Sequence, residues 1–204
     1  MTNYPVLAAL AALLAGATPA ASPAAPPAPA GTAAAAAAGT PYRQAPGASL
    51  TFTFDQAGAE NRGSFGQFTT VLVYDEKNPT AGSLEVTVQM ASLDTQDKDR
   101  NETLAGEDLL DTKKFPTARY TAGSFAKRAD GTLEAVGKLT LRGVTRDLRV
   151  PLTIRKTGTG LEISGEVTVR RLDYGVGQGE WKSTEWVGND VRLQYKVPMM
   201  PAKS

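Results

Sequence analysis

Apolar and polar residues alternate along most of the chain between residues 48 and 197, and this period of two constrains the fold more than any other feature. In the stretch 137–154, every second residue on either side of Gly143 is apolar: Leu139, Leu141, Leu148, Val150, Leu152 and Ile154. Alternation places apolar side chains on one face of a strand and polar ones on the other. Gly143 can adopt the positive φ that a tight connection needs. The stretch therefore predicts an antiparallel hairpin with one dry face and one wet face.

Eight segments of the chain read as such strands: 50–54, 65–74, 84–90, 118–122, 133–141, 148–154, 161–169 and 191–197. The segment 57–63 between the first two is rich in turn-forming residues and predicts a loop. No long helix stands between the strands as a parallel sheet would require, so the sheet should be antiparallel. Antiparallel strands in this number remove their edges by closing into a barrel or splitting into a sandwich.

Several positions on the predicted apolar face are small: Ala118, Ala122, Ala135, Gly137 and Gly165. An eight-stranded barrel can be filled by its own side chains or can hold one small ligand. Small inner residues leave room for a ligand, or they merely fit the taper of the barrel against its phenylalanines. The residues alone leave both interpretations open.

The alternation breaks at residues 95–111, a charged segment that predicts a short helix or two. Asp94 or Thr95 can cap this helix, and the leucines of 104–110 can attach it to the sheet. Its carboxylates Asp94, Asp97, Asp99 and Glu102 lack the spacing of an EF-hand loop, so we interpret them as a solvated helix start and predict no metal site.

The N-terminal region has a different composition. Residues 6–17 form an apolar run that is too short to span a bilayer and suits a signal peptide, with an A-x-A site at 15–17, although the n-region carries no Lys or Arg. We predict a signal peptide at 1–17, an Ala/Pro-rich linker at 18–41 and a barrel domain at 42–204, hence export from the cytoplasm.

Composition excludes several classes of function. The chain has neither Cys nor His, which removes thiolate chemistry, the commonest zinc ligand and the usual base of a hydrolytic triad. A net charge of +1 predicts no nucleic-acid partner. We predict no catalytic residues and no enzyme activity. An enzyme that uses a carboxylate, with Glu180 or Glu185 as candidates, is the weaker alternative.

An ordered set of motifs resembles the YceI-like family of exported bacterial proteins, also called polyisoprenoid-binding. The motifs are G-x-F-x-x-F at 63–68, S-L-D-T at 92–95, R-N-E-T-L at 100–104, E-D-L-L-D at 107–111, F-P-T-A-R-Y at 115–120, G-K-L-T-L-R-G-V-T-R at 137–146, R-L-D-Y-G-V-G-Q-G-E-W at 171–181 and N-D-V-R-L at 189–193. The resemblance implies an all-β fold, an eight-stranded antiparallel lipocalin-like barrel with a short helical insertion. It also implies an elongated apolar pore that holds an isoprenoid chain, which favours a cavity over a filled barrel.

We therefore predict that the inward-facing apolar residues line this pore and bind the ligand, together with two tryptophans of a Gly-rich loop: Phe52, Phe54, Phe68, Leu72, Val86, Val88, Tyr120, Leu139, Leu141, Val150, Leu152, Val167, Val169, Leu193, Trp181 and Trp186. Four arginines can meet a head group or be solvated surface: Arg142, Arg146, Arg170 and Arg171.

As the resemblance implies, the predicted function is that of an exported, non-enzymatic protein of the bacterial periplasm, holding a polyprenyl phosphate or a quinone tail in its barrel. The alternative is stress protection, or partnership with a membrane cytochrome in a quinone redox complex. An isoprenoid lipid or quinone is the expected ligand, no other cofactor is expected, and a homodimer is left open.

Overall fold

The computed structural model describes residues 39–202, and the predicted signal peptide and linker residues 18–38 lie outside this range. The first strand begins at Thr40, two residues before the predicted start of the barrel domain. The strands are β1 (Thr40–Gln44), β2 (Ser49–Gln56), β3 (Ala59–Phe65), β4 (Phe68–Tyr74), β5 (Ser83–Gln89), β6 (Leu93–Asp94), β7 (Thr117–Lys127), β8 (Leu133–Leu141), β9 (Val144–Thr157), β10 (Gly160–Arg170) and β11 (Asp190–Pro201). The helical elements are α1 (Lys98–Ala105) and the 3-10 turns η1 (Pro79–Ala81), η2 (Met90–Ser92), η3 (Arg171–Tyr174) and η4 (Gly179–Lys182).

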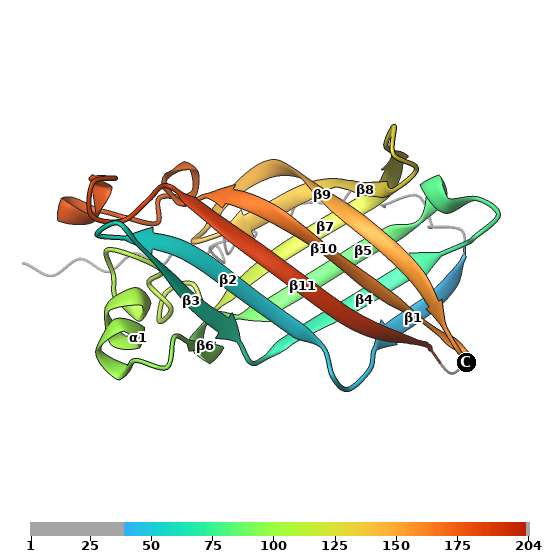
Figure 1. The fold of residues 1–204 in the computed structure, drawn as a ribbon, viewed down its shortest axis with the longest axis horizontal. Coiled ribbons are helices and arrows are strands. Elements are labelled where there is room, and N and C mark those ends of the chain that lie inside the picture. The colour runs from blue at the N-terminus through green and yellow to red at the C-terminus, as the bar shows by residue number, and fades with distance from the viewer. Residues whose placement is uncertain (1–38, 203–204) are drawn as a thin grey trace, which may run out of the picture. The chain divides into compact units, whose positions relative to one another are not determined.

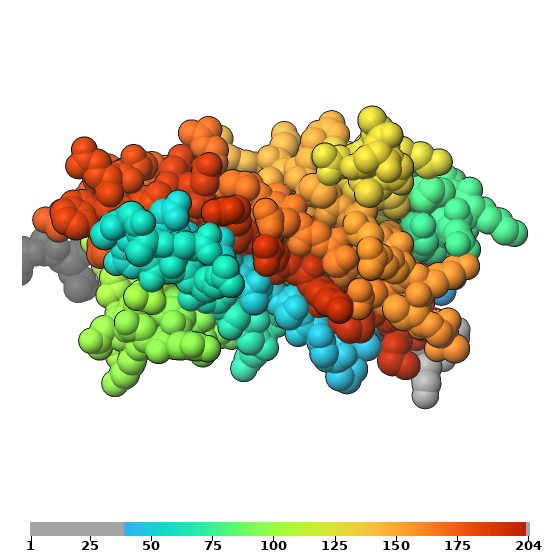
Figure 2. Space-filling model, viewed as in Figure 1, coloured from blue at the N-terminus to red at the C-terminus, as the bar shows by residue number. Residues whose placement is uncertain are grey.

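All paired strands are antiparallel, and eight of them close a ring in the order β1, β4, β5, β7, β8, β9, β10, β11, with β11 returning to β1 (Figure 1). Three further strands extend the wall, because β2 pairs with the other part of β11, β3 with β2, and β6 with β3. β1 and β2, β3 and β4, and β5 and β6 are each consecutive in the chain across a short break. When each of these pairs of consecutive strands is counted as one interrupted strand, the barrel has eight strands. The predicted eight-stranded antiparallel barrel is therefore confirmed. Side chains of β11 fill the strip between those of β2 and β10 on the face that Figure 2 shows.

The predicted hairpin around Gly143 is confirmed. β8 and β9 pair from Leu141↔Val144 to Leu133↔Leu152, and only Arg142 and Gly143 lie between them. Both have positive φ, at 48° and 74°. Two-residue hairpin loops with positive φ at both positions match the right-handed twist of the strands.

The loop predicted at 57–63 is wrong. The turn consists of Ala57 and Gly58 alone, and residues 59–65 form β3, which pairs with β2 from Gln56↔Ala59 to Thr51↔Ser64. Most side chains at the start of β3 are polar and exposed. Backbone pairing with β2, and not burial of an apolar face, holds this strand, so hydrophobic alternation gave no sign of it.

The helical insertion is one α-helix and a turn-rich segment. Asp97 caps α1, because its Oδ1 accepts a hydrogen bond from the Arg100 amide at 3.0 Å. The expected caps are wrong. Asp94 accepts from the Gln96 amide instead, and the Thr95 hydroxyl donates to Asn101. No helix within residues 39–202 combines the length and the hydropathy needed to span a bilayer.

The two ends of the barrel differ. The end that carries α1, η3 and η4 is here called the helical end (Figure 1). There, leucines of the insertion pack against the phenylalanines of β2. At the opposite end, here called the closed end, the barrel is filled by a core that includes Leu72, Phe125, Leu133, Leu152, Leu161 and Met199. Space for a ligand therefore lies between the closed end and the helical end.

Candidate functional site

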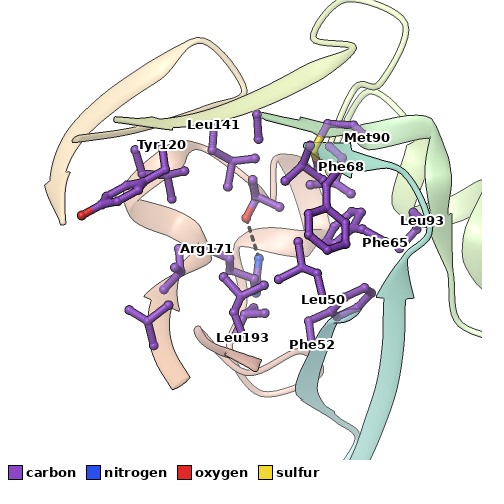
Figure 3. Close-up of a pocket in the computed structure, with 18 of the residues that line it drawn as sticks. Leu50, Phe52, Phe65, Phe68, Met90, Leu93, Tyr120, Leu141, Arg171 and Leu193 are labelled. Atoms are coloured by element: carbon purple, nitrogen blue, oxygen red, sulfur yellow. Dashed lines mark hydrogen bonds between the residues drawn. The ribbon is translucent and has the colours of Figure 1, made fainter. Parts of the chain in front are cut away.

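A cavity of about 240 Å³ lies inside the barrel. Every strand except β1 contributes to its wall, and its cover at the helical end comes from α1, the segment 109–110 and the loop 176–187. The Phe52 ring is tilted against that of Phe65, with centroids 5.1 Å apart, and is stacked with that of Phe54 at 6.1 Å. Figure 3 shows Phe52, Phe65 and Phe68 on one side of the cavity and Tyr120 on the other.

Most of the predicted pore residues line this cavity: Phe52, Phe54, Phe68, Val86, Val88, Tyr120, Leu139, Leu141, Val150, Val167, Val169, Trp181 and Leu193. The strand residues among them face the cavity because every second side chain of a strand points to the inside of the barrel. That these residues contact a ligand stays a prediction.

Three predicted residues do not line the cavity. Leu72 and Leu152 are 0% and 1% exposed and belong to the packed core of the closed end. Trp186 is 68% exposed and points away from the interior. Alternation tells which face a residue occupies, but it does not tell how far along the barrel the residue lies.

Other lining residues were not predicted. Leu148, Ile163, Tyr195 and Val197 share the inward parity of their strands, so a longer reading of the same pattern finds them. Thr103, Leu104, Leu109 and Leu110 come from the insertion, where no strand period exists to indicate an inward face.

Two tyrosines occupy the space that two glycines leave free. The Tyr120 hydroxyl shares its one proton between the carbonyls of Ala135 and Leu148, at 3.0 and 3.1 Å. A Cβ on Gly137 would collide with the Thr121 carbonyl oxygen and lie 2.8 Å from that hydroxyl, so both the backbone of β7 and the tyrosine require a glycine here. The Gly137 position therefore serves packing and does not make room for a ligand.

Tyr195 on β11 and Gly165 on β10 repeat this arrangement. The Tyr195 hydroxyl donates to the carbonyl of Pro151, and a side chain on Gly165 would collide with it. Burial raises the pKa of the Tyr120 and Tyr195 phenols, so both are neutral donors over the physiological range.

The wall is incomplete between β9 and β10. Their pairing runs from Gly160↔Thr157 only to Ser164↔Thr153. Pro151 lies just beyond, and it has no N–H to continue the ladder. Tyr195 crosses this place to the Pro151 carbonyl, and Arg146 donates to the carbonyl of Asp173, which ties η3 to β9.

Arg171 organises the cover at the helical end. Its side chain is 4% exposed and donates five hydrogen bonds, to the carbonyls of Val176, Trp181, Ser183, Val187 and Gly188. Figure 3 shows Arg171 among the residues that line the cavity. Desolvation lowers the pKa of this guanidinium, but every N–H has a carbonyl partner. Arg171 therefore has no donor left for a head group.

The other candidate arginines also hold the chain itself. Arg142 donates to the Glu107 carbonyl at 2.6 Å, and Arg170 lies 3.9 Å from the Asp173 carboxylate. Glu180 and Glu185, the candidate catalytic carboxylates, are exposed and outside the cavity lining. Residues 39–202 contain no cluster of three or more acidic, His or Cys side chains that could hold a metal ion.

The fold and the cavity together define a closed antiparallel barrel around an apolar, ligand-sized space. A family model described as a YceI-like domain matches residues 42–199, and the chain belongs to this family. The chain is 33% identical over 116 residues to protein YceI of Escherichia coli, and 32% identical over 116 residues to that of Salmonella arizonae. Both matches cover 53% of this chain and 60% of the relative, so the chain spans about three fifths of the curated relatives' length.

Solved structures share the fold. BcnA of Burkholderia cenocepacia superimposes with a TM-score of 0.71 at 28% identity, covering 74% of this chain and 95% of BcnA. A polyisoprenoid binding domain from Saccharophagus degradans gives 0.62 at 14% identity, covering 81% and 100%. The YCEI protein of Campylobacter jejuni gives 0.59 at 21% identity, covering 70% and 85%. The last two likenesses show the fold alone.

Proposed function

We propose that the barrel binds an isoprenoid-type amphiphile in its cavity and catalyses no reaction on it. The observation that carries the proposal is the cavity itself, because its lining is almost entirely aliphatic and aromatic. Apolar pockets with few polar groups are typical of sites for apolar ligands. The absence of carboxylates from the lining supports a carrier over an enzyme. The name of the Saccharophagus degradans structure, a polyisoprenoid binding domain, supports the same ligand class.

Burial of the chain supplies the affinity. Each buried methylene contributes about 0.8 kcal/mol, so a tail that buries sixteen of them, partly in the cavity and partly along the helical end, gains about 13 kcal/mol. An association cost of about 5 kcal/mol leaves about 8 kcal/mol, which corresponds to a micromolar dissociation constant. A cavity of about 240 Å³ exceeds the 150 Å³ of an apolar cavity that holds benzene, and it suits part of a long chain. The remainder of a longer tail would extend through the helical end.

Export to the periplasm and the signal peptide remain part of this proposal. Only the resemblance supports four further expectations: a role beside a membrane cytochrome, a role in stress protection, a quinone as ligand and a homodimer.

A paired substitution tests the proposal. Val86→Phe adds carbon atoms inside the cavity, and Val71→Phe adds the same atoms on the outer face of the neighbouring strand, where Val71 is exposed. Displacing about three methylene groups of ligand costs about 2.4 kcal/mol, or roughly fiftyfold in affinity. We expect this loss for Val86→Phe and a change below about threefold for Val71→Phe, where no ligand group is displaced.

Fluorescence of Trp181 reports binding of geranylgeraniol in this test. The chain has two tryptophans, so Trp186→Phe leaves Trp181 as the single reporter, and Trp181 lines the cavity. An unresponsive Trp181 together with no retention of radiolabelled geranylgeraniol would overturn the proposal. Equal loss of affinity in the two phenylalanine variants would move the site out of the barrel.

A further inference from the structure

The apolar cavity contains one unpartnered polar spot. Thr70 lines the cavity and is only 2% exposed, yet its hydroxyl has no hydrogen-bond partner. Within residues 39–202, three buried side-chain polar atoms lack a partner, and a second of them is Oε1 of Gln44. An unpaired buried hydroxyl or amide is costly, so two of them in one place require an explanation.

These two residues are neighbours on the inner face of the barrel, where Thr70 belongs to the cavity lining and Gln44 adjoins it without lining the cavity itself. β1 pairs with β4 through Tyr42↔Leu72 and Arg43↔Val71, and the next position along this register sets Gln44 opposite Thr70. On its other side Gln44 pairs with Met199, which is part of the buried core. Side chains directly opposite each other on neighbouring strands lie close together.

The orientation of the Gln44 amide is fixed. Its Nε2 donates to the Phe68 carbonyl at 3.1 Å, which leaves Oε1 as a free acceptor. Thr70 can donate one hydrogen bond and accept others. The series Phe68, Thr70, Leu72 is inward-facing, and valine at position 70 would have the same shape without the unpaired hydroxyl.

A ligand that satisfies this pair must donate to Gln44 and accept from Thr70. A neutral O–H group does both. A ketone or quinone carbonyl can accept from Thr70, but it places an acceptor against Oε1 of Gln44. A phosphate needs cations, and the two charged residues of the lining are Arg100 and Arg171, which belong to the helical end.

We propose that Gln44 and Thr70 form a subsite for the hydroxyl group of an alcohol, phenol or hydroquinone that enters the barrel with this group first. The inference rests on the proposed function, since it names the ligand class of the same cavity. It selects a neutral hydroxylated amphiphile over a quinone or a polyprenyl phosphate.

The test compares geranylgeraniol with its methyl ether, which has the same chain but no O–H donor. Binding is read from Trp181 in the Trp186→Phe background. One hydrogen bond is worth about five- to tenfold in affinity, so the alcohol should bind tighter than the ether by about that factor. Either oxygen can accept from Thr70, so Thr70→Val should weaken the alcohol and the ether by a similar factor. Gln44→Met removes the acceptor that only the alcohol uses, so it should reduce binding of the alcohol to the level of the ether and leave the ether unchanged.

Thr69→Val is the matched control, because Thr69 is the adjacent threonine on the exposed face of β4. It should leave the affinities for both ligands unchanged. Equal binding of the alcohol and the ether by the protein with Gln44 and Thr70 intact would overturn the subsite, and water would then be the partner of the Gln44 and Thr70 oxygens. The proposed function would stand. Failure of both ligands to bind would remove the subsite together with the proposed function.

Discussion

Replacement of Arg171 by methionine should destabilise the protein severely. The five carbonyls that this guanidinium binds span residues 176–188, and methionine leaves all of them without a donor. A buried carbonyl left unpaired costs about 1 kcal/mol or more, which gives about 5 kcal/mol for five. Water that enters the relaxed loop recovers part of this, so we expect a loss of about 3–5 kcal/mol. Domains of this kind have only about 5–15 kcal/mol of stability, so the effect will be large.

Equilibrium unfolding in urea, followed by Trp181 fluorescence and by circular dichroism, measures this loss. Arg170→Met is the matched control, because Arg170 is exposed and its carboxylate contact is at 3.9 Å. It should change the free energy of unfolding by less than about 0.5 kcal/mol. Arg171→Lys should fall between the two, since an ammonium cannot reproduce the planar set of five donors. A loss below about 1 kcal/mol for Arg171→Met would refute the assignment of Arg171 as the centre of the cover.

Three further predictions follow from the fold. Asp97→Ala should cost about 1 kcal/mol in urea unfolding, because it removes the cap of α1; no change would show that tertiary contacts alone hold the helix. Gly143→Ala should cost about 1–3 kcal/mol in the same assay, since position 143 has a φ of 74° and a Cβ there would lie 2.7 Å from the Phe115 ring; an unchanged midpoint would contradict the turn geometry. Burial raises the pKa of Tyr120 and Tyr195 above the ordinary 10.0, so these phenols ionise in the unfolded chain at a lower pH than in the folded protein. The free energy of unfolding should therefore be highest below about pH 10 and fall as the pH rises above it. Urea unfolding at stepped alkaline pH measures this fall, and a free energy that does not change with pH would contradict the burial of both phenols.

The sequence predicted the barrel because strand pairing and alternation are coupled. One face of each strand must be apolar to close around a common interior, so eight alternating segments were enough to define eight walls. The same parity placed residues such as Val86 and Leu139 in the cavity lining. Parity carries no information about depth, and Leu72 and Leu152 therefore belong to the closed end instead.

The remaining features depend on contacts between distant parts of the chain. Gly137 and Gly165 left open whether small inner residues make room for a ligand, and each accommodates a tyrosine from a neighbouring strand. Arg171 looked like a candidate for a head group, and it instead binds five carbonyls of the loop that follows it. Neither pairing leaves a periodic signal, because it depends on which residues meet across the sheet.

Mass spectrometry of an organic extract tests the central claim most directly. The protein would be purified from its native envelope, so that a resident ligand is retained. We predict about one isoprenoid-type amphiphile per chain, bearing a free hydroxyl group if the Gln44–Thr70 subsite is occupied. An extract without such a species, from a protein that also fails to bind geranylgeraniol, would contradict the account and leave the cavity as a packing defect of the barrel.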